Sequence, residues 1–235
     1  MTEFAPLLAL LSDETIWLHL GIVGAWLAIA ILTAEWLHRK IDLGAETARK
    51  IVHISSGNVV LIAWWLQMPE WIIVMAAAIA GAMALVSYQI PILPSINSVG
   101  RQSLGTFFYA ISIGFLTIWF WPDQPQFTVL GILVMAWGDG LAATVGQRFG
   151  RHPYQILGIK KSWEGTSTMG IVSFAVVSLV LFAVQGAVWQ TWAIALIVAI
   201  AATALEAFSK LGVDNLTVPL GSAALAFVLS QMWLV

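Results

Sequence analysis

The sequence predicts an all-α fold, a polytopic membrane bundle of about seven or eight transmembrane helices in a single domain over residues 1–235. Hydrophobic residues make up 60% of the chain and charged residues only 9%, against about 25% charged residues in typical soluble domains. Apolar stretches follow one another along the whole chain, and its ten Lys and Arg lie in or beside the loops between them. A chain with so few charged residues cannot form a polar surface that would keep it soluble in water. We therefore expect a lipid bilayer around it and no nucleic-acid partner.

The first half of the chain contains four apolar stretches close to the roughly 20 residues that cross a bilayer. They lie at about 16–34, 52–66, 71–87 and 104–121, and none contains Asp, Glu, Lys or Arg. The second stretch is short, and its inner half carries His53, Ser55, Ser56 and Asn58. Polar residues in a membrane segment usually face protein or a cavity, so we expect this half to face away from lipid.

The second half of the chain contains four more stretches, at about 127–147, 165–184, 188–205 and 216–235. The fifth differs from all the others because it holds a carboxylate, Asp139. An ionisable group in a membrane segment costs roughly 2.5–3.5 kcal/mol and usually marks function. The alternative is that Asp139 merely lies at a helix end and has no function. The depth of Asp139 in the span favours a functional role.

Charge sorting between the loops predicts the topology. With the N-terminus outside, the inner loops are 35–51, 88–103, 148–164 and 206–215, and every Lys and Arg lies in or at the edge of one of them. The outer segments hold five acidic residues and no basic one. By the positive-inside rule, we expect these loops on the cytoplasmic side. The N-terminus has no basic region, so we expect its first apolar run to remain as a helix.

The same topology gathers the unusual polar groups at one membrane interface. The set is Arg49, Lys50, His53, Gly105, Thr106, Tyr109, Asp139, Lys160, Lys161, Ser162, Glu164, Thr166, Glu206, Asp214 and Asn215. Carboxylates beside lysines suit a polyphosphate with its magnesium, because Mg²⁺ takes one or two carboxylates together with phosphate oxygens and water. Lysines neutralise phosphate oxygens. The sequence thus predicts a site where a water-soluble nucleotide meets a lipid-soluble acceptor.

Plainer explanations remain open for several of these residues. Arg49 and Lys50 are equally typical of topology-setting residues that extend to the interface. Gly146 and Gly150 have the spacing of close helix packing, and His53 suits a hydrogen-bonded structural role. The segment 158–162 resembles the end of a P-loop, but it lacks the glycine spacing, and we expect no strand before it.

Five segments in this order resemble the phytol kinase and dolichol kinase family. They are RKIVH at 49–53, GTFFY at 105–109, GDGLAATVGQRFG at 138–150, KKSWEGT at 160–166 and EAFSKLGVDNLTVPL at 206–220. Members of this family are multi-pass membrane enzymes that phosphorylate long-chain polyprenols, typically with CTP. The resemblance implies CTP-dependent phosphorylation of a prenol such as phytol, geranylgeraniol or farnesol, with Mg²⁺ as cofactor.

The central segment is also similar to the phosphatidate cytidylyltransferases, which make a CDP-lipid from a lipid phosphate and CTP. Their C-terminal signature is absent, and residues 212–215, GVDN, stand in its place. This favours a kinase and leaves the cytidylyltransferase as the alternative. A small transporter is a third possibility, but it would carry its polar groups near the membrane midplane in matched halves.

The resemblance also implies roles for individual residues. The predicted catalytic residues are Asp139, Lys161 and Glu164, the predicted CTP-binding residues are Arg49, Lys160, Ser162 and Asn215, and the predicted metal ligands are Asp139 and Asp214. Lys160 and Lys161 would hold the phosphates and stabilise the charge of transfer. Glu164 would either position metal-bound water or accept the alcohol proton.

Overall fold

The computed structural model describes residues 14–41, 45–89 and 104–234 and confirms the all-α membrane bundle. Its elements, in chain order, are α2 (Glu14–Ile41), α3 (Ala45–Gly57), α4 (Val59–Trp65), α5 (Glu70–Gln89), α7 (Gly105–Phe120), α8 (Pro125–Leu133), the π-helix η1 (Val134–Asp139), α9 (Gly140–Phe149), β1 (Pro153–Ile156), β2 (Ile159–Ser162), α10 (Trp163–Gln185), α11 (Trp189–Phe208) and α12 (Asp214–Leu234). Six helical segments of the described chain are long and apolar enough to cross a membrane.

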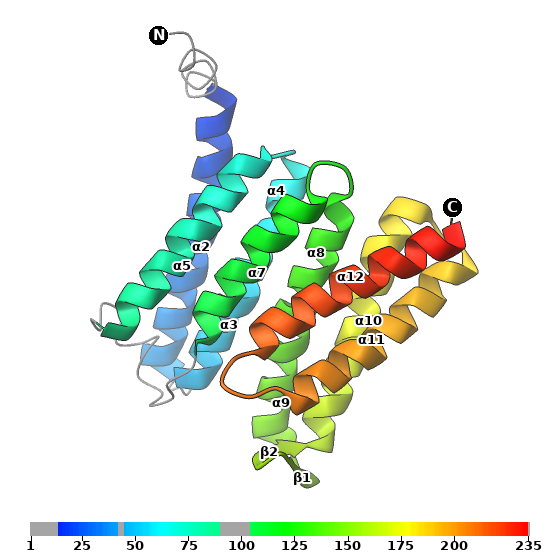
Figure 1. The fold of residues 1–235 in the computed structure, drawn as a ribbon. Helices are drawn as coiled ribbons and strands as arrows, with labels where there is room; N and C mark the ends of the chain where they lie inside the picture. The colour runs from blue at the N-terminus through cyan, green and yellow to red at the C-terminus, as the bar shows by residue number, and fades with distance from the viewer. Residues whose placement is uncertain (1–13, 42–44, 90–103, 235) are drawn as a thin grey trace.

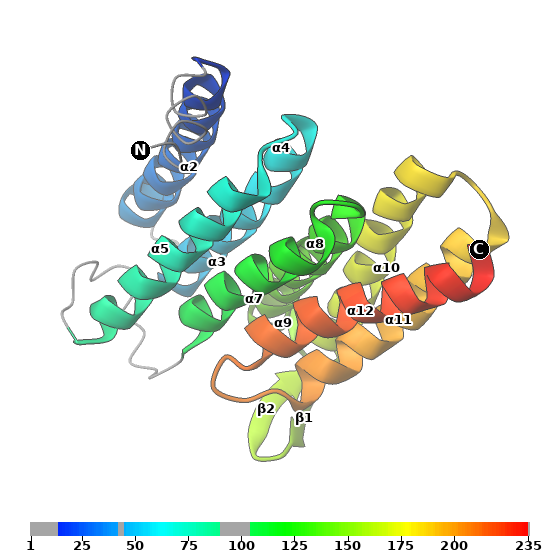
Figure 2. The ribbon, with the colours of Figure 1, turned by 45° about the horizontal axis from the view of Figure 1, so that its top comes forward.

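The bundle is built around the pass formed by α8, η1 and α9, which continue end to end (Figure 1). Helices α3, α7, α10 and α12 all pack against it. Within its apolar window 61% of the residues are buried, against 11% for α2 at the edge of the bundle. Turning the molecule leaves the same order, with α2 and α5 on one side and α10 to α12 on the other (Figure 2). The central pass therefore holds its residues at a fixed place among the other helices.

The second predicted span is a single pass with a small interruption. It comprises α3 and α4, which are separated by Asn58. Asn58 keeps helical backbone angles of −68° and −14°, and its Oδ1 accepts a hydrogen bond of 2.8 Å from Nε1 of Trp137. A Cβ added to Gly57 would lie 2.3 Å from Cβ of Ala136. The interruption lies at a close contact between this pass and the central one, and the Asn58–Trp137 hydrogen bond joins the two passes there.

The fifth predicted span contains a turn of π-helix that the sequence did not predict. The turn covers Val134–Asp139, so Asp139 is its last residue. A π turn adds one residue to the ordinary helical turn and often occurs at functional sites. Because Gly138 has no side chain, Met169 can pack closely against it: Sδ of Met169 lies 2.6 Å from the position that a Cβ would occupy. The central pass is thus irregular in the turn that presents its carboxylate.

The predicted inner loop 148–164 contains a β-hairpin. Strands β1 and β2 pair antiparallel, so the expectation that no strand precedes Gly158 is wrong. The two turn residues, Leu157 and Gly158, both have positive φ, at 48° and 80°, as the tightest hairpin turns require. Successive side chains of a strand point to opposite faces. Lys160 is therefore exposed, while Lys161 turns towards the bundle.

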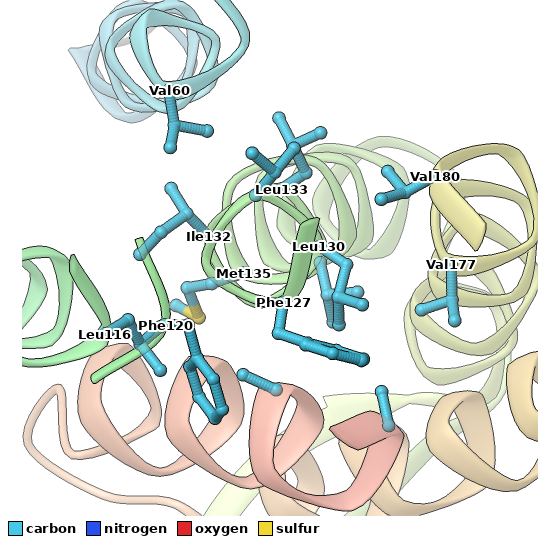
Figure 3. Packing of buried hydrophobic residues seen from close by; sticks show 14 of the residues in the cluster. Val60, Leu116, Phe120, Phe127, Leu130, Ile132, Leu133, Met135, Val177 and Val180 are labelled. Atoms are coloured by element: carbon cyan, nitrogen blue, oxygen red, sulfur yellow. The ribbon is translucent and has the colours of Figure 1, made fainter. Parts of the chain in front are cut away.

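The apolar core surrounds α8 on several sides (Figure 3). Val60 of α4 faces Ile132 on one side, and Val177 of α10 lies on the other side near Leu130. Both α8 residues are fully buried. Side chains from several helices pack against α8. A larger residue on α8 therefore cannot be accommodated by a shift of one neighbouring helix.

We expect Gly131→Ala in α8 to lower the stability of the protein. The new Cβ would lie 2.6 Å from the backbone oxygen of Pro219 and 3.1 Å from Cβ of Ala223, so helix α12 would have to move. Overpacking of this kind costs about 1–3 kcal/mol, which should lower the midpoint of thermal unfolding in detergent. Gly21→Ala in α2 is the matched control, because no atom lies within 4 Å of its Cβ position. Equal midpoints for the two variants would contradict this account of the core.

Candidate active site

Six charged residues gather near one end of the bundle. This charged cluster consists of Arg49 and Lys50 from α3, Asp139 from η1, Lys161 from β2, Glu206 from α11 and Asp214 from α12. Each lies close enough to other members to interact with them electrostatically. In Figure 1 these elements meet at the lower end, where α3 begins, the hairpin lies and α11 passes into α12. Segments far apart in the sequence thus build one site.

The centre of the charged cluster is an ion pair between Asp139 and Lys50. Both residues are buried, with 8% and 7% of their surface exposed. Nε2 of His53 lies 3.9 Å from Oδ2 of the same carboxylate. The sequence pointed to Asp139 but gave Lys50 no role in the site. The signal was the RKIVH segment, which puts Lys50 and His53 three residues apart and therefore on one face of a helix.

A second ion pair joins the hairpin to α11. Nζ of Lys161 lies 2.5 Å from Oε1 of Glu206 and also donates a hydrogen bond to its backbone oxygen. Glu206 is 9% exposed, and its Oε2 has no hydrogen-bond partner within the described residues. The sequence placed Glu206 among the polar groups of this interface without assigning it a role. The sequence signal that could have identified Glu206 is its position, because it is a carboxylate directly after the apolar stretch 188–205.

The start of α12 adds the third carboxylate. Asp214 interacts electrostatically with Asp139, Lys50 and Lys161. Its Oδ1 accepts hydrogen bonds from the backbone N and from Nδ2 of Asn215, at 3.1 and 3.2 Å. The backbone oxygen of Asn215 accepts a bond of 2.7 Å from Oγ of Ser112 in α7. Asn215 therefore orients Asp214 and ties it to α7.

Arg49 lies at the edge of the charged cluster and is paired within its own helix. Its Nε and Nη2 donate hydrogen bonds to the two carboxylate oxygens of Glu46, at 3.0 and 2.5 Å. Burial favours the neutral acid, but the hydrogen bonds and charge of Arg49 outweigh it and hold the pKa of Glu46 below its ordinary value. Arg49 also interacts with Asp139 and Asp214, and 39% of its side chain is exposed. It can therefore reach an incoming anion.

Three of the predicted site residues lie outside these contacts. Oγ of Ser162 accepts a hydrogen bond of 3.2 Å from the backbone N of Gly165 and so caps α10. The carboxylate of Glu164 accepts one from the backbone N of His152 and lies 2.6 Å from its Nδ1. Across the described ranges, Ser162, Glu164 and Lys160 form no ion pair or hydrogen bond with the charged cluster. The catalytic role of Glu164 stays a prediction. Its contacts with His152, the residue before β1, favour a structural role in which Glu164 fixes the hairpin to α10.

The carboxylates of the charged cluster fit a magnesium ion that arrives with phosphate. Nowhere in the described chain do three or more His, Cys, Asp or Glu residues form a group that could hold a metal. Mg²⁺ does not need such a group, because it usually takes one or two carboxylates and completes its shell with phosphate oxygens and water. Asp139 and Asp214 interact with each other and lie beside Lys50. This donor set suits a metal–polyphosphate.

Comparison with known proteins shows relatives over most of the chain. The chain is 52% identical over 220 residues to a phytol kinase of Synechocystis sp., covering 93% of this chain and 94% of the relative. It is 30% identical to a probable chloroplastic phytol kinase of Triticum aestivum, covering 77% and 67%. It is 28% identical to a chloroplastic phytol kinase 1 of Arabidopsis thaliana, covering 88% and 76%. No family model and no solved structure matches the chain.

Proposed function

This chain belongs to the phytol kinase family, and from that premise we propose that it transfers the γ-phosphate of CTP to the hydroxyl of a long-chain prenol. It is a membrane-embedded kinase with an alcohol acceptor. The proposed acceptors are phytol, geranylgeraniol and farnesol. In the reaction the prenol oxygen forms a bond to the γ-phosphorus, the bond from that phosphorus to the β–γ bridging oxygen breaks, CDP leaves and the hydroxyl proton is lost.

The observation that carries this proposal is the charged cluster at one end of an otherwise apolar bundle. It brings three cationic side chains, Arg49, Lys50 and Lys161, together with three carboxylates. A triphosphate and its magnesium present the complementary charges, since phosphate oxygens seek cations and the metal seeks carboxylates. An isolated surface ion pair involves only two side chains. This cluster instead draws residues from five elements, and it includes the buried pair of Lys50 and Asp139.

We assign the phosphates to Lys161 and Arg49. Lys161 is partly buried on the inner face of the hairpin, and Arg49 is partly exposed at the edge of the cluster. Lys160, on the outer face of the hairpin, would attract the anionic nucleotide towards the site rather than grip it. Ser162 and Asn215 would support the site indirectly, by capping α10 and by orienting Asp214.

Asp139 and Asp214 would hold the magnesium. When bound, Mg²⁺ neutralises phosphate charge and favours transfer by electrostatics. Phosphoryl transfer depends on positioning and charge stabilisation more than on a strong base. A rigid central pass that fixes Asp139, together with the hydrogen bonds that fix Asp214, supports this assignment.

We further propose that the prenol approaches from the bilayer and CTP from the cytoplasm. The apolar helices expose many large side chains to lipid, and a prenol tail would lie among them with its hydroxyl at the level of the charged cluster. The basic residues of the described chain are Arg39, Lys40, Arg49, Lys50, Arg148, Arg151, Lys160, Lys161 and Lys210; Arg101 lies outside the described residues. The positive-inside rule supports a cytoplasmic location for the end that carries them.

The test is a transfer assay on purified protein in detergent with magnesium. Each of the four nucleoside triphosphates, labelled at the γ-phosphate, is offered with phytol, geranylgeraniol, farnesol or no lipid. We expect label in a lipid monophosphate, with CTP at least about tenfold faster than the other nucleotides, and loss of transfer when EDTA removes the metal. With a lipid phosphate as the acceptor in place of the alcohol, release of labelled pyrophosphate and formation of a CDP-lipid would instead identify a cytidylyltransferase. A preference for ATP would contradict the choice of donor.

A further inference from the structure

Two buried polar atoms beside Asp139 have no hydrogen-bond partner within the described residues. They are Nε2 of His53 and Oη of Tyr109. A buried polar atom without a partner is costly, and in a native structure each such atom needs an explanation. Most of the other unpartnered atoms of this kind are Ser and Thr hydroxyls on the apolar helices. His53 and Tyr109 differ from these because they face each other next to the charged cluster.

The two side chains form a compact pair at the inner ends of α3 and α7. Their ring centroids lie 4.6 Å apart with an angle of 41° between the rings. Nε2 of His53 lies 3.9 Å from Oδ2 of Asp139, which is too far for a direct hydrogen bond. One oxygen atom at an ordinary distance of about 2.8 Å from each could reach both. A hydroxyl oxygen that binds Nε2 can therefore lie close to this carboxylate.

The surrounding backbone fixes the position of both rings. The backbone of Met135, within the π-helix, lies close enough to the His53 ring to interact with it. Because Nε2 has no partner within the described residues, we assign this contact to Nδ1. On the other side, a Cβ added to Gly57 would lie 2.7 Å from Oη of Tyr109. His53 thus lies against the central pass, and Tyr109 lies against the end of α3.

The hydrogen-bonding character of the two free atoms limits the groups that can pair with both of them. If Nδ1 donates to the carbonyl of Met135, Nε2 is left as an acceptor. The Tyr109 hydroxyl has a proton to donate. A ligand that satisfies both atoms must donate one hydrogen bond and accept another through the same group. An alcohol does this, whereas an ether or a hydrocarbon does not.

Resting on the kinase function proposed above, we propose that His53 and Tyr109 form the subsite that binds the hydroxyl of the acceptor prenol. The hydroxyl donates to Nε2 of His53 and accepts from Oη of Tyr109. This places its oxygen beside Asp139, which would hold the magnesium of the nucleotide. The pair therefore selects an alcohol and orients it for attack, while the charged cluster binds the nucleotide.

The test separates binding of the alcohol from binding of the nucleotide. Tyr109→Phe removes only the hydroxyl, His53→Leu removes both ring nitrogens, and His53→Gln keeps polar atoms on a side chain of similar reach. Tyr88→Phe is the matched control, because Tyr88 is an exposed tyrosine at the end of α5. We expect kcat/KM for phytol to fall about tenfold in Tyr109→Phe and about hundredfold in His53→Leu, with His53→Gln between them and Tyr88→Phe unchanged. KM for CTP should stay within about twofold of the wild type.

A second measurement needs no nucleotide. Phytol should raise the midpoint of thermal unfolding more than 2-phytene, the hydrocarbon that keeps the double bond and lacks the hydroxyl. This excess should vanish in Tyr109→Phe and His53→Leu and persist in Tyr88→Phe. If the wild type transfers no phosphate but keeps the excess, the kinase proposal fails and the alcohol subsite stands.

Two outcomes would overturn the subsite. Wild-type kcat/KM for phytol in both Tyr109→Phe and His53→Leu would show that neither atom touches the alcohol. An equal loss for phytol and CTP, together with a lower unfolding midpoint without ligand, would assign the pair a structural role only.

Discussion

Asp139→Asn is expected to abolish phosphate transfer, with at least a thousandfold loss of kcat on the scale of removed charged groups in transfer sites. The amide keeps the shape of the side chain but loses the charge that would hold the metal. It also leaves Lys50 buried without its partner, and breaking a buried ion pair costs about 3–5 kcal/mol. The measurements are transfer from γ-labelled CTP and the midpoint of unfolding in detergent.

A double variant separates catalysis from folding at this pair. Replacing both members by apolar residues of similar size, Lys50→Met with Asp139→Leu, removes the unpaired charge. Such replacements of buried pairs are often neutral or stabilising by about 1–4 kcal/mol. The double variant should therefore recover the midpoint that Asp139→Asn loses, while its transfer stays absent. Wild-type transfer in either variant would remove Asp139 from the active site.

Lys161→Met should have the second-largest effect, with kcat/KM for CTP lowered about 10²- to 10³-fold. Its ammonium lies on the inner face of the hairpin beside Glu206, where charge developing on the transferred phosphate would be stabilised. Lys160→Met should cost far less, because this lysine lies on the exposed face of the same strand. The two variants remove the same group one residue apart, so only the direction of the side chain differs.

Steady-state kinetics with CTP as the varied substrate measure this contrast. Lys210→Met, at an exposed position between α11 and α12, is the control for loss of a lysine as such. Because Lys161→Met leaves Glu206 buried and unpaired, Lys161→Met with Glu206→Gln tests whether instability explains the loss. That double variant should regain stability without regaining activity. Equal losses for Lys160→Met and Lys161→Met would mean that the hairpin does not orient Lys161 into the site.

The sequence was sufficient for those features that local composition determines. The apolar runs predict the passes because each is long enough to cross the bilayer, and α5, α7, α10 and α11 begin and end within about three residues of the predicted limits. Asp139 stood out because a carboxylate in an apolar run has few structural explanations. The prediction that several loops meet at one end followed from topology alone.

The partners inside the site could not be predicted, because they depend on contacts between distant segments. Lys50 and Asp139 are 89 residues apart, and no local pattern selects this pair over the other charges of the interface. Both adjacent lysines were predicted to hold the CTP phosphates, because 148–164 was treated as a loop that fixes the direction of neither side chain. The hairpin, whose turn contains a leucine with positive φ, separates them by strand alternation. The π turn is one extra residue in a helix and leaves no periodic trace.

The long separation of the central ion pair also constrains how the chain is made. At about 5–20 residues per second, a ribosome needs roughly 4–18 s to add the 89 residues that follow Lys50 before Asp139 exists. An unpaired lysine resists burial in lipid during this interval. We therefore expect α3 to stay at the water surface until the central pass has been translated, so that its docking is a late step in the biogenesis of the protein.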